Sequence, residues 1–165
     1  MQDVKTKLTQ PQIIQDIINQ VCLPLNATKR QTPELATKIL RRDASDPKFN
    51  CRFHYHGGIR RLKFLEKITH PEMLYPTHQC ARLPKDPRAP HGAEAKKFVK
   101  YLPVTKKYGL IWDPKKNQNL EVYADSDFSG NCHNTTAPEY FSTEKLHTSY
   151  TMFCTGCPII WDFTI

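Results

Sequence analysis

The chain has 165 residues, 39% of them hydrophobic, which is enough for one domain or for pieces of two adjoining domains. Lysine and arginine outnumber aspartate and glutamate by 24 to 16, and the formal net charge of +8 favours an acidic partner, most commonly nucleic acid. The first ten residues lack the apolar core of a signal peptide and no segment approaches the roughly 18 apolar residues of a membrane span, so we expect an intracellular protein of the cytoplasm or nucleus.

The first third of the chain, residues 1–52, predicts an edge strand, a helix and a linker. Residues 4–8 alternate as in a short edge strand. Pro11 suits the first turn of a helix, where its missing N–H leaves no hydrogen bond unmade. The next apolar residues recur at helical spacing and form one stripe: Ile13, Ile14, Ile17, Ile18 and Val21. A second, short helix is predicted from Thr32 onward, and residues 42–52 read as a polar connector.

Residues 53–107 predict three helical segments separated by prolines. The first covers residues 54–67, and Gly57 and Gly58 weaken its start by about 1 kcal/mol each. The second contains Pro76 in its interior. A proline there removes one hydrogen bond and clashes with the preceding turn, so we expect a kink.

The third helical segment begins near Pro90 and combines an apolar face with a basic one. Its inward-facing positions are Ala95, Phe98, Val99 and Leu102. The basic residues on its other face and just beyond it are Lys96, Lys97, Lys100, Lys106 and Lys107. Arg60 and Arg61 add two more charges on the first segment. A lysine-rich helix face is usually a solvated surface, but the net charge makes phosphate contact a competing interpretation.

The last third, residues 108–165, predicts a small antiparallel meander. Strands are expected at residues 109–112, 119–130, 146–154 and 157–161, and Gly156 suits the tight turn between the last two. With the helices that precede it, this meander predicts an α+β fold.

The strand at residues 119–130 is the most informative stretch. Its apolar and polar residues alternate with a period of two, which is typical of a half-buried strand. Asp125 and Asp127 therefore project from one face, together with Glu121 and Tyr123. Because crowded carboxylates repel one another, such a face either lies in water or holds a divalent cation.

Short motifs run through nearly the whole chain in a fixed order. In sequence letters they are LTQP at 8–11, FHY at 53–55, HPEM at 70–73, HQCAR at 78–82, YGL at 108–110, YADSDFSGN at 123–131 and GCPIIW at 156–161. In this order and spacing the series resembles the Pol polyprotein of copia-type LTR retrotransposons. The resemblance implies the end of the reverse transcriptase in residues 1–52, a thumb or connection in 53–107, and the first strands of a truncated ribonuclease H domain in 108–165.

The resemblance implies a role for one residue of the acidic strand. Asp125 falls on the first metal-binding carboxylate of the nuclease, whereas Asp127 is a neighbour to which we assign no catalytic role. A ribonuclease H cleaves the RNA strand of a hybrid with two Mg²⁺ ions held between carboxylates. The implied partners are therefore RNA, DNA or an RNA–DNA hybrid, and the implied cofactor is Mg²⁺.

The same comparison predicts that the chain is catalytically inactive by itself. No two aspartates are adjacent in the sequence, so the paired aspartates of the polymerase are missing. The nuclease glutamate belongs to a helix that would follow the last residue, and one carboxylate cannot hold two Mg²⁺ ions against their hydration shells. Departures from the family pattern suggest a decayed or truncated copy: Arg60, Arg61, His70, Pro103 and Val104. Missing polyprotein segments or another chain would then cover the open sheet.

Two other interpretations stay open. The chain could be a stand-alone basic nucleic-acid-binding module, or an interaction module adopted by its host, and salt-dependent affinity would mark the former. It could also hold zinc, since Cys154 and Cys157 form a Cys-x-x-Cys pair to which Cys132, His133 and His147 could add ligands. One such pair is half a zinc signature and here falls in a predicted turn, so we favour a structural role for these cysteines.

Overall fold

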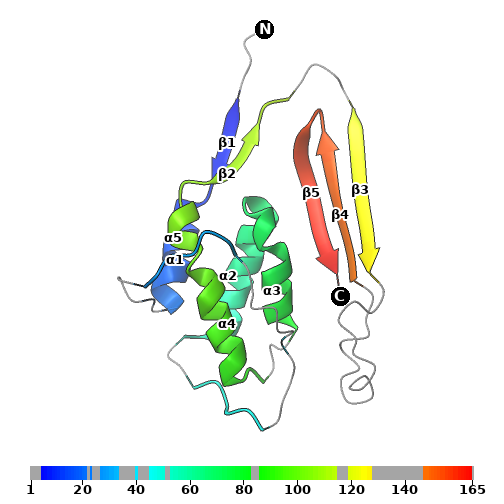
Figure 1. Cartoon of the computed structure of the whole chain (residues 1–165). Coiled ribbons are helices and arrows are strands. Elements are labelled where there is room, and N and C mark those ends of the chain that lie inside the picture. The colour runs from blue at the N-terminus through cyan, green and yellow to red at the C-terminus, as the bar shows by residue number, and fades with distance from the viewer. Residues whose placement is uncertain are drawn as a thin grey trace. The chain divides into compact units, whose positions relative to one another are not determined.

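Figure 1 shows the computed structural model of the chain. The residues that it describes are 5–21, 23, 27–33, 40, 45–50, 53–82, 86–114, 119–127 and 147–164. They form helices and antiparallel sheets, so the predicted α+β class is confirmed. The chain divides into two compact units: a helical unit, Thr9–Gly109, and a strand unit, Met1–Leu8 with Leu110–Ile165.

The helical unit is a small group of packed helices. In chain order these are α1 (Pro11–Val21), α2 (Tyr55–Ile68), the 3₁₀ turn η1 (Pro71–Met73), α3 (Leu74–Ala81), α4 (Ala89–Val99) and α5 (Leu102–Thr105). None of the helices in the described part of the chain combines the length and apolarity needed to cross a lipid bilayer. The short helix predicted from Thr32 onward falls on residues 34–39, which lie outside the described part.

The first predicted helix is present as α1, and its apolar stripe faces the core of the helical unit. Ile14, Ile17 and Val21 have no exposed surface. Each such side chain contributes about 1.5–3 kcal/mol when it leaves water. Because α1 packs against α2, α4 and α5, the expected segments 1–52 and 53–107 contribute to one hydrophobic core.

The third predicted helical segment is present as α4 followed by α5. Its four predicted inward residues are all fully buried, which confirms the interpretation of its apolar face: Ala95, Phe98, Val99 and Leu102. The charged face of α4 is left toward solvent, with Lys97 exposed and Lys96 half-buried.

The start of α2 is capped by His54, and the glycine at position 58 has a structural reason. The Nδ1 atom of His54, the residue before the helix, accepts a hydrogen bond from the Gly57 N–H at 3.0 Å and so caps the first turn. A Cβ atom on Gly58 would lie 2.3 Å from the Cε2 atom of Phe53, inside the van der Waals contact distance. The low helix propensity of glycine is accepted here because a buried aromatic ring packs directly on the backbone.

The prediction that Pro76 lies in a helix interior is wrong. The chain changes from a 3₁₀ turn to an α-helix between Met73 and Leu74, and Pro76 is the third residue of α3. The N–H groups of a first helical turn have no partner within the helix, so a proline at this position removes no hydrogen bond. The irregularity thus precedes the proline.

His70 lies fully buried at the junction between α2 and η1. Its Nδ1 atom lies 2.8 Å from the Thr69 hydroxyl oxygen. Burial lowers the pKa of His70 below 6.5, against smaller raising effects from the Glu72 charge and the Thr105 backbone. Protonation of this ring is therefore disfavoured in the folded state.

This burial predicts a pH dependence of stability. Because the pKa of His70 is lower folded than unfolded, its contribution is fully present above pH 6.5 and is lost as the pH falls through the folded value. The loss has a slope of up to about 1.4 kcal/mol per pH unit. Urea unfolding at a series of pH values should show a shallower decline for His70→Gln than for the unchanged chain. Equal slopes in the two proteins would contradict this assignment.

The described β-structure comprises a two-stranded and a three-stranded antiparallel sheet. Its strands are β1 (Thr6–Thr9), β2 (Gly109–Trp112), β3 (Leu120–Asp127), β4 (His147–Cys154) and β5 (Cys157–Thr164). β3, β4 and β5 pair in that order, which confirms the predicted meander. Thr155 and Gly156, with φ angles of 52° and 77°, make the tight turn between β4 and β5.

The expectation that β3 is half-buried is wrong. All eight of its residues are exposed, including Val122 at 57% and Tyr123 at 61%. β3 is an edge strand of the three-stranded sheet, with β4 as its neighbour. The period of two fixes the face on which each side chain lies, but it does not determine whether another layer covers that face.

Candidate nucleic-acid interface

The acidic face of β3 continues across the sheet. Asp125 lies opposite Ser149 of β4, and Asp127 lies opposite His147. His147 of β4 and Trp161 of β5 are each 6% exposed, so this face is covered at these two positions, whereas the acids lie on the exposed edge strand.

The spacing of these acids does not build a two-metal site. Residues two apart on a strand are separated by about 7 Å, so Asp125 and Asp127 are neighbours while Glu121 lies about 13 Å from Asp125. Within the described residues no group of three or more His, Cys, Asp or Glu side chains could hold a metal ion. The residues that the structure describes around Asp125 therefore do not fit the Mg²⁺ pair that the resemblance implies, and we derive no metal-dependent step from them.

The proposed zinc ligands that the structure describes do not come together either. His147 and Cys154 are the two ends of β4, about 23 Å apart at the rise of an extended strand. Cys154 is exposed and Cys157 is buried, both as free thiols, and the Asp113 N–H donates a hydrogen bond to the Cys157 sulfur at 3.3 Å. The other suggested ligands, at positions 132 and 133, lie outside the described residues. His147 is therefore not part of a site with this cysteine pair.

The predicted basic residues fall into more than one group. Arg60 and Arg61 are exposed on α2, where the Arg61 guanidinium donates a hydrogen bond to the Gln20 side chain of α1 at 2.6 Å. Lys106 instead donates one to Gln15 of α1 at 2.8 Å. Residues five apart on a helix differ by about 140° in direction, so these two contacts lie on different sides of α1.

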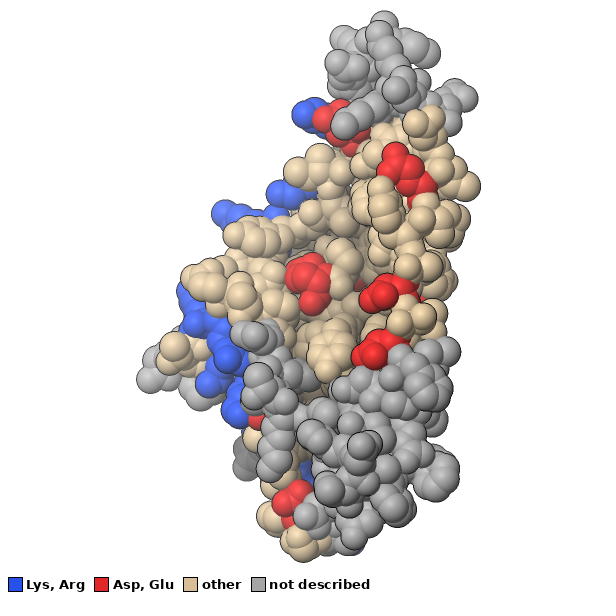
Figure 2. Space-filling view, turned by 45° about the vertical axis from the view of Figure 1, so that its right-hand side comes forward, with Lys and Arg blue, Asp and Glu red and all other residues tan. Residues whose placement is uncertain are grey.

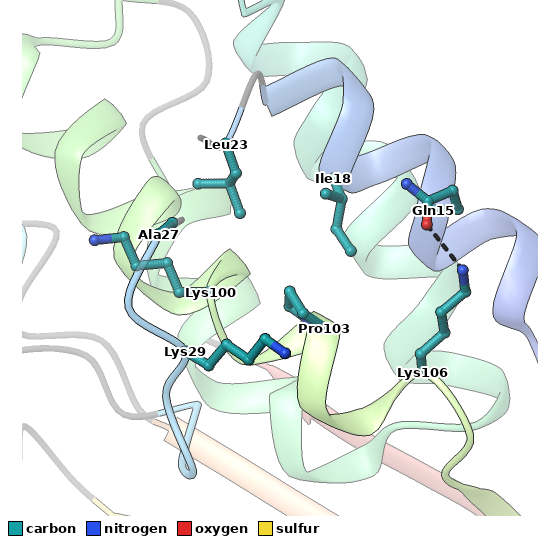
Figure 3. A pocket seen from close by; sticks show the side chains of 8 residues that line it. All are labelled: Gln15, Ile18, Leu23, Ala27, Lys29, Lys100, Pro103 and Lys106. Carbon is teal, nitrogen blue, oxygen red and sulfur yellow. Dashed lines mark hydrogen bonds between the residues drawn. The ribbon is translucent and has the colours of Figure 1, made fainter. Parts of the chain in front are cut away.

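Two of the predicted lysines, Lys100 and Lys106, line one pocket of about 220 Å³ in the helical unit (Figure 3). Its other lining residues come from α1, from the segment after it and from α5: Gln15, Ile18, Leu23, Ala27, Lys29 and Pro103. The three remaining predicted lysines do not line the pocket: Lys96 is half-buried on α4, Lys97 forms an ion pair with Glu94 of the same helix, and Lys107 is exposed just beyond Lys106.

Lys29 was not predicted as a site residue. It lies in an irregular segment that carries no helical or strand period, so nothing in the sequence relates it to α4. The structure supplies the link, since the Arg30 N–H donates a hydrogen bond to the Lys100 carbonyl at 3.2 Å. This backbone contact docks the segment on the end of α4 and places Lys29 beside residues about seventy positions away in sequence.

The pocket thus combines charge with an aliphatic surface. Three lysines reach it from two separate stretches of the chain, and its walls are formed by Ile18, Leu23, Ala27 and Pro103. Lys and Arg side chains also form a run at one edge of the face drawn in Figure 2. No protein-family model, curated protein or solved structure matches the chain.

Proposed function

We propose that this chain is a nucleic-acid-binding segment of the copia-type reverse transcriptase and ribonuclease H region, which binds the phosphate backbone without cleaving it. The observation that carries the proposal is the convergence of Lys29, Lys100 and Lys106 on one pocket of a chain with a net charge of +8. The ordered motifs that resemble the copia-type polyprotein support the same class of partner.

Phosphate contact explains the chemistry of this group better than a solvated surface does. A solvated lysine face needs no fixed arrangement, whereas here a hydrogen bond between main chains holds Lys29 near Lys100, and Gln15 holds Lys106. A polyanion neutralises these cations and releases its own counterions when it binds. Such contacts carry no sequence information, so we expect binding with little base preference.

The dependence of binding on salt tests this proposal. Each phosphate contact lowers log affinity by roughly 0.7–0.9 per unit of log salt, so Lys29→Gln, Lys100→Gln and Lys106→Gln combined should reduce the slope by about 2–3. Fluorescence anisotropy with labelled single-stranded RNA and an RNA–DNA hybrid measures the slope.

A charge-matched control separates this group from net charge. Lys7→Gln, Lys48→Gln and Lys63→Gln change three exposed lysines outside the pocket and remove the same total charge. Binding that is independent of salt, or equal losses in both triple variants, would contradict the proposal. Cleavage of the hybrid in Mg²⁺ that disappears in Asp125→Asn would contradict its non-catalytic part.

A further inference from the structure

A phosphate by itself would neither fill the pocket nor cover its apolar walls. Its volume of about 220 Å³ is below the roughly 300–1,000 Å³ of pockets for drug-sized ligands. Ile18 and Pro103 point into it from opposite sides, and Leu23 and Ala27 close it on the side of the irregular segment (Figure 3). A small apolar group would bury these aliphatic surfaces, whereas a phosphate would leave them in contact with water.

The charged groups are arranged around this apolar centre. In Figure 3 the Lys29 side chain runs beneath Pro103 with its amino group toward the middle of the pocket, and the Lys106 amino group meets Gln15 at one side. Lys100 lines the pocket with its aliphatic stem, and its amino group points away. An anionic group is therefore expected beside the Lys29 amino group, next to the apolar centre.

We propose that the pocket binds one nucleotide unit of a bound strand, with its base against Ile18, Leu23 and Pro103 and its phosphate beside Lys29. This inference rests on the proposed function, because a nucleic acid strand carries near each phosphate a small, flat base whose ring faces make apolar contacts. An inorganic anion would contact the lysines but not the aliphatic walls. A neutral apolar ligand would contact the walls but not the lysine amino groups. The nucleotide uses both.

The base must leave its stack to enter the pocket. Unstacking costs a few kcal/mol in a duplex and least in a single strand, so the pocket favours single-stranded nucleic acid over a duplex. The walls are aliphatic, so the contribution of the base comes from buried area and not from ring stacking. Little discrimination between the bases follows from such walls.

A nuclear magnetic resonance titration with three probes tests the site directly. Uridine monophosphate should shift the methyl resonances of Ile18, Leu23 and Ala27 in a saturable way. Ribose phosphate, which lacks the base, and uridine, which lacks the phosphate, should each bind at least about tenfold more weakly, the equivalent of about 1.4 kcal/mol. Equal affinity for ribose phosphate would reduce the pocket to a plain anion site and overturn the proposal.

Substitutions in one short segment supply the matched control. Ala27→Leu fills the pocket without changing any charge, whereas Thr28→Leu places the same side chain at the next, exposed position, which does not line the pocket. We expect Ala27→Leu to abolish the saturable methyl shifts of Ile18 and Leu23, and Thr28→Leu to leave them unchanged. Equal effects of the two substitutions would contradict a nucleotide in the pocket.

An oligonucleotide experiment separates this inference from the proposed function. A single strand with abasic sites keeps its phosphates, so it should still bind with the same salt slope, but without the methyl shifts seen with the intact strand. If intact and abasic strands bind with equal affinity and shift no pocket methyl, the nucleotide site is wrong and the proposed phosphate binding stands. If neither strand binds, the proposed function fails, and the titration with uridine monophosphate decides the pocket by itself.

Discussion

Replacing Phe98 with alanine is expected to destabilise the helical unit by about 3–5 kcal/mol. Phe98 of α4 has no exposed surface and belongs to the core that α1, α2 and α4 share. Its removal gives up the buried apolar area and leaves a cavity that the surrounding helices fill only in part. Because the free energy of unfolding of a domain is only about 5–15 kcal/mol, this one substitution would remove a large share of it. Urea unfolding followed by circular dichroism measures the loss.

Phe64→Ala is the matched control, because it makes the same substitution at the surface. It lies on α2 with 51% of its surface exposed. Phe64→Ala should change the free energy of unfolding by no more than about 0.5 kcal/mol, as surface substitutions usually do. Similar losses for Phe64→Ala and Phe98→Ala would mean that α4 does not pack as the structure has it.

Replacing Gly92 with alanine is expected to cost about 1–3 kcal/mol, although alanine is the better helix former. A Cβ atom on Gly92 would lie 1.9 Å from the Cε2 atom of Phe49. That ring packs edge-on against Phe53 and Tyr55, with centroids 6.1 Å and 5.7 Å away, so it moves aside only by giving up these contacts. Overpacking therefore outweighs the gain in helix propensity.

A double-mutant cycle isolates this contact. In a Phe49→Ala background the ring is gone, and Gly92→Ala should then stabilise the chain by up to about 1 kcal/mol, because the gain in helix propensity remains. The sign of the effect thus reverses between the two backgrounds. Denaturant unfolding of the four proteins gives the cycle, and a cost that is the same in both backgrounds would place the strain elsewhere.

Regular periodicity made much of the fold predictable. The isoleucine stripe of α1, the four buried residues of α4 and α5, and the alternation in the last third all depend on neighbours within one element, and the structure has these elements where the sequence predicts them. The position of Pro76 was predicted wrongly because the start of α3 at Leu74 is not visible in the sequence. A proline is tolerated in the first turn of a helix but disrupts a helix interior.

The candidate site was only half predictable for the same physical reason. Lys100 and Lys106 stand out because a lysine-rich helix face has a period, whereas Lys29 joins them through the contact of the Arg30 N–H with the Lys100 carbonyl. That contact depends on tertiary packing of an irregular segment, for which no local pattern exists. Likewise, alternation placed Asp125 on one face of its strand but could not predict which other acids would lie nearby.

The position of β3 at an edge of its sheet gives its acids a role that needs no ligand. An edge strand presents unpaired N–H and C=O groups on which a strand of another copy can add, and Leu120 and Val122 would favour such an addition. Glu121, Asp125 and Asp127 line one face of this edge, so two copies that add edge to edge would bring like charges together. In this arrangement the like charges of the carboxylates oppose fibril-like growth along the edge.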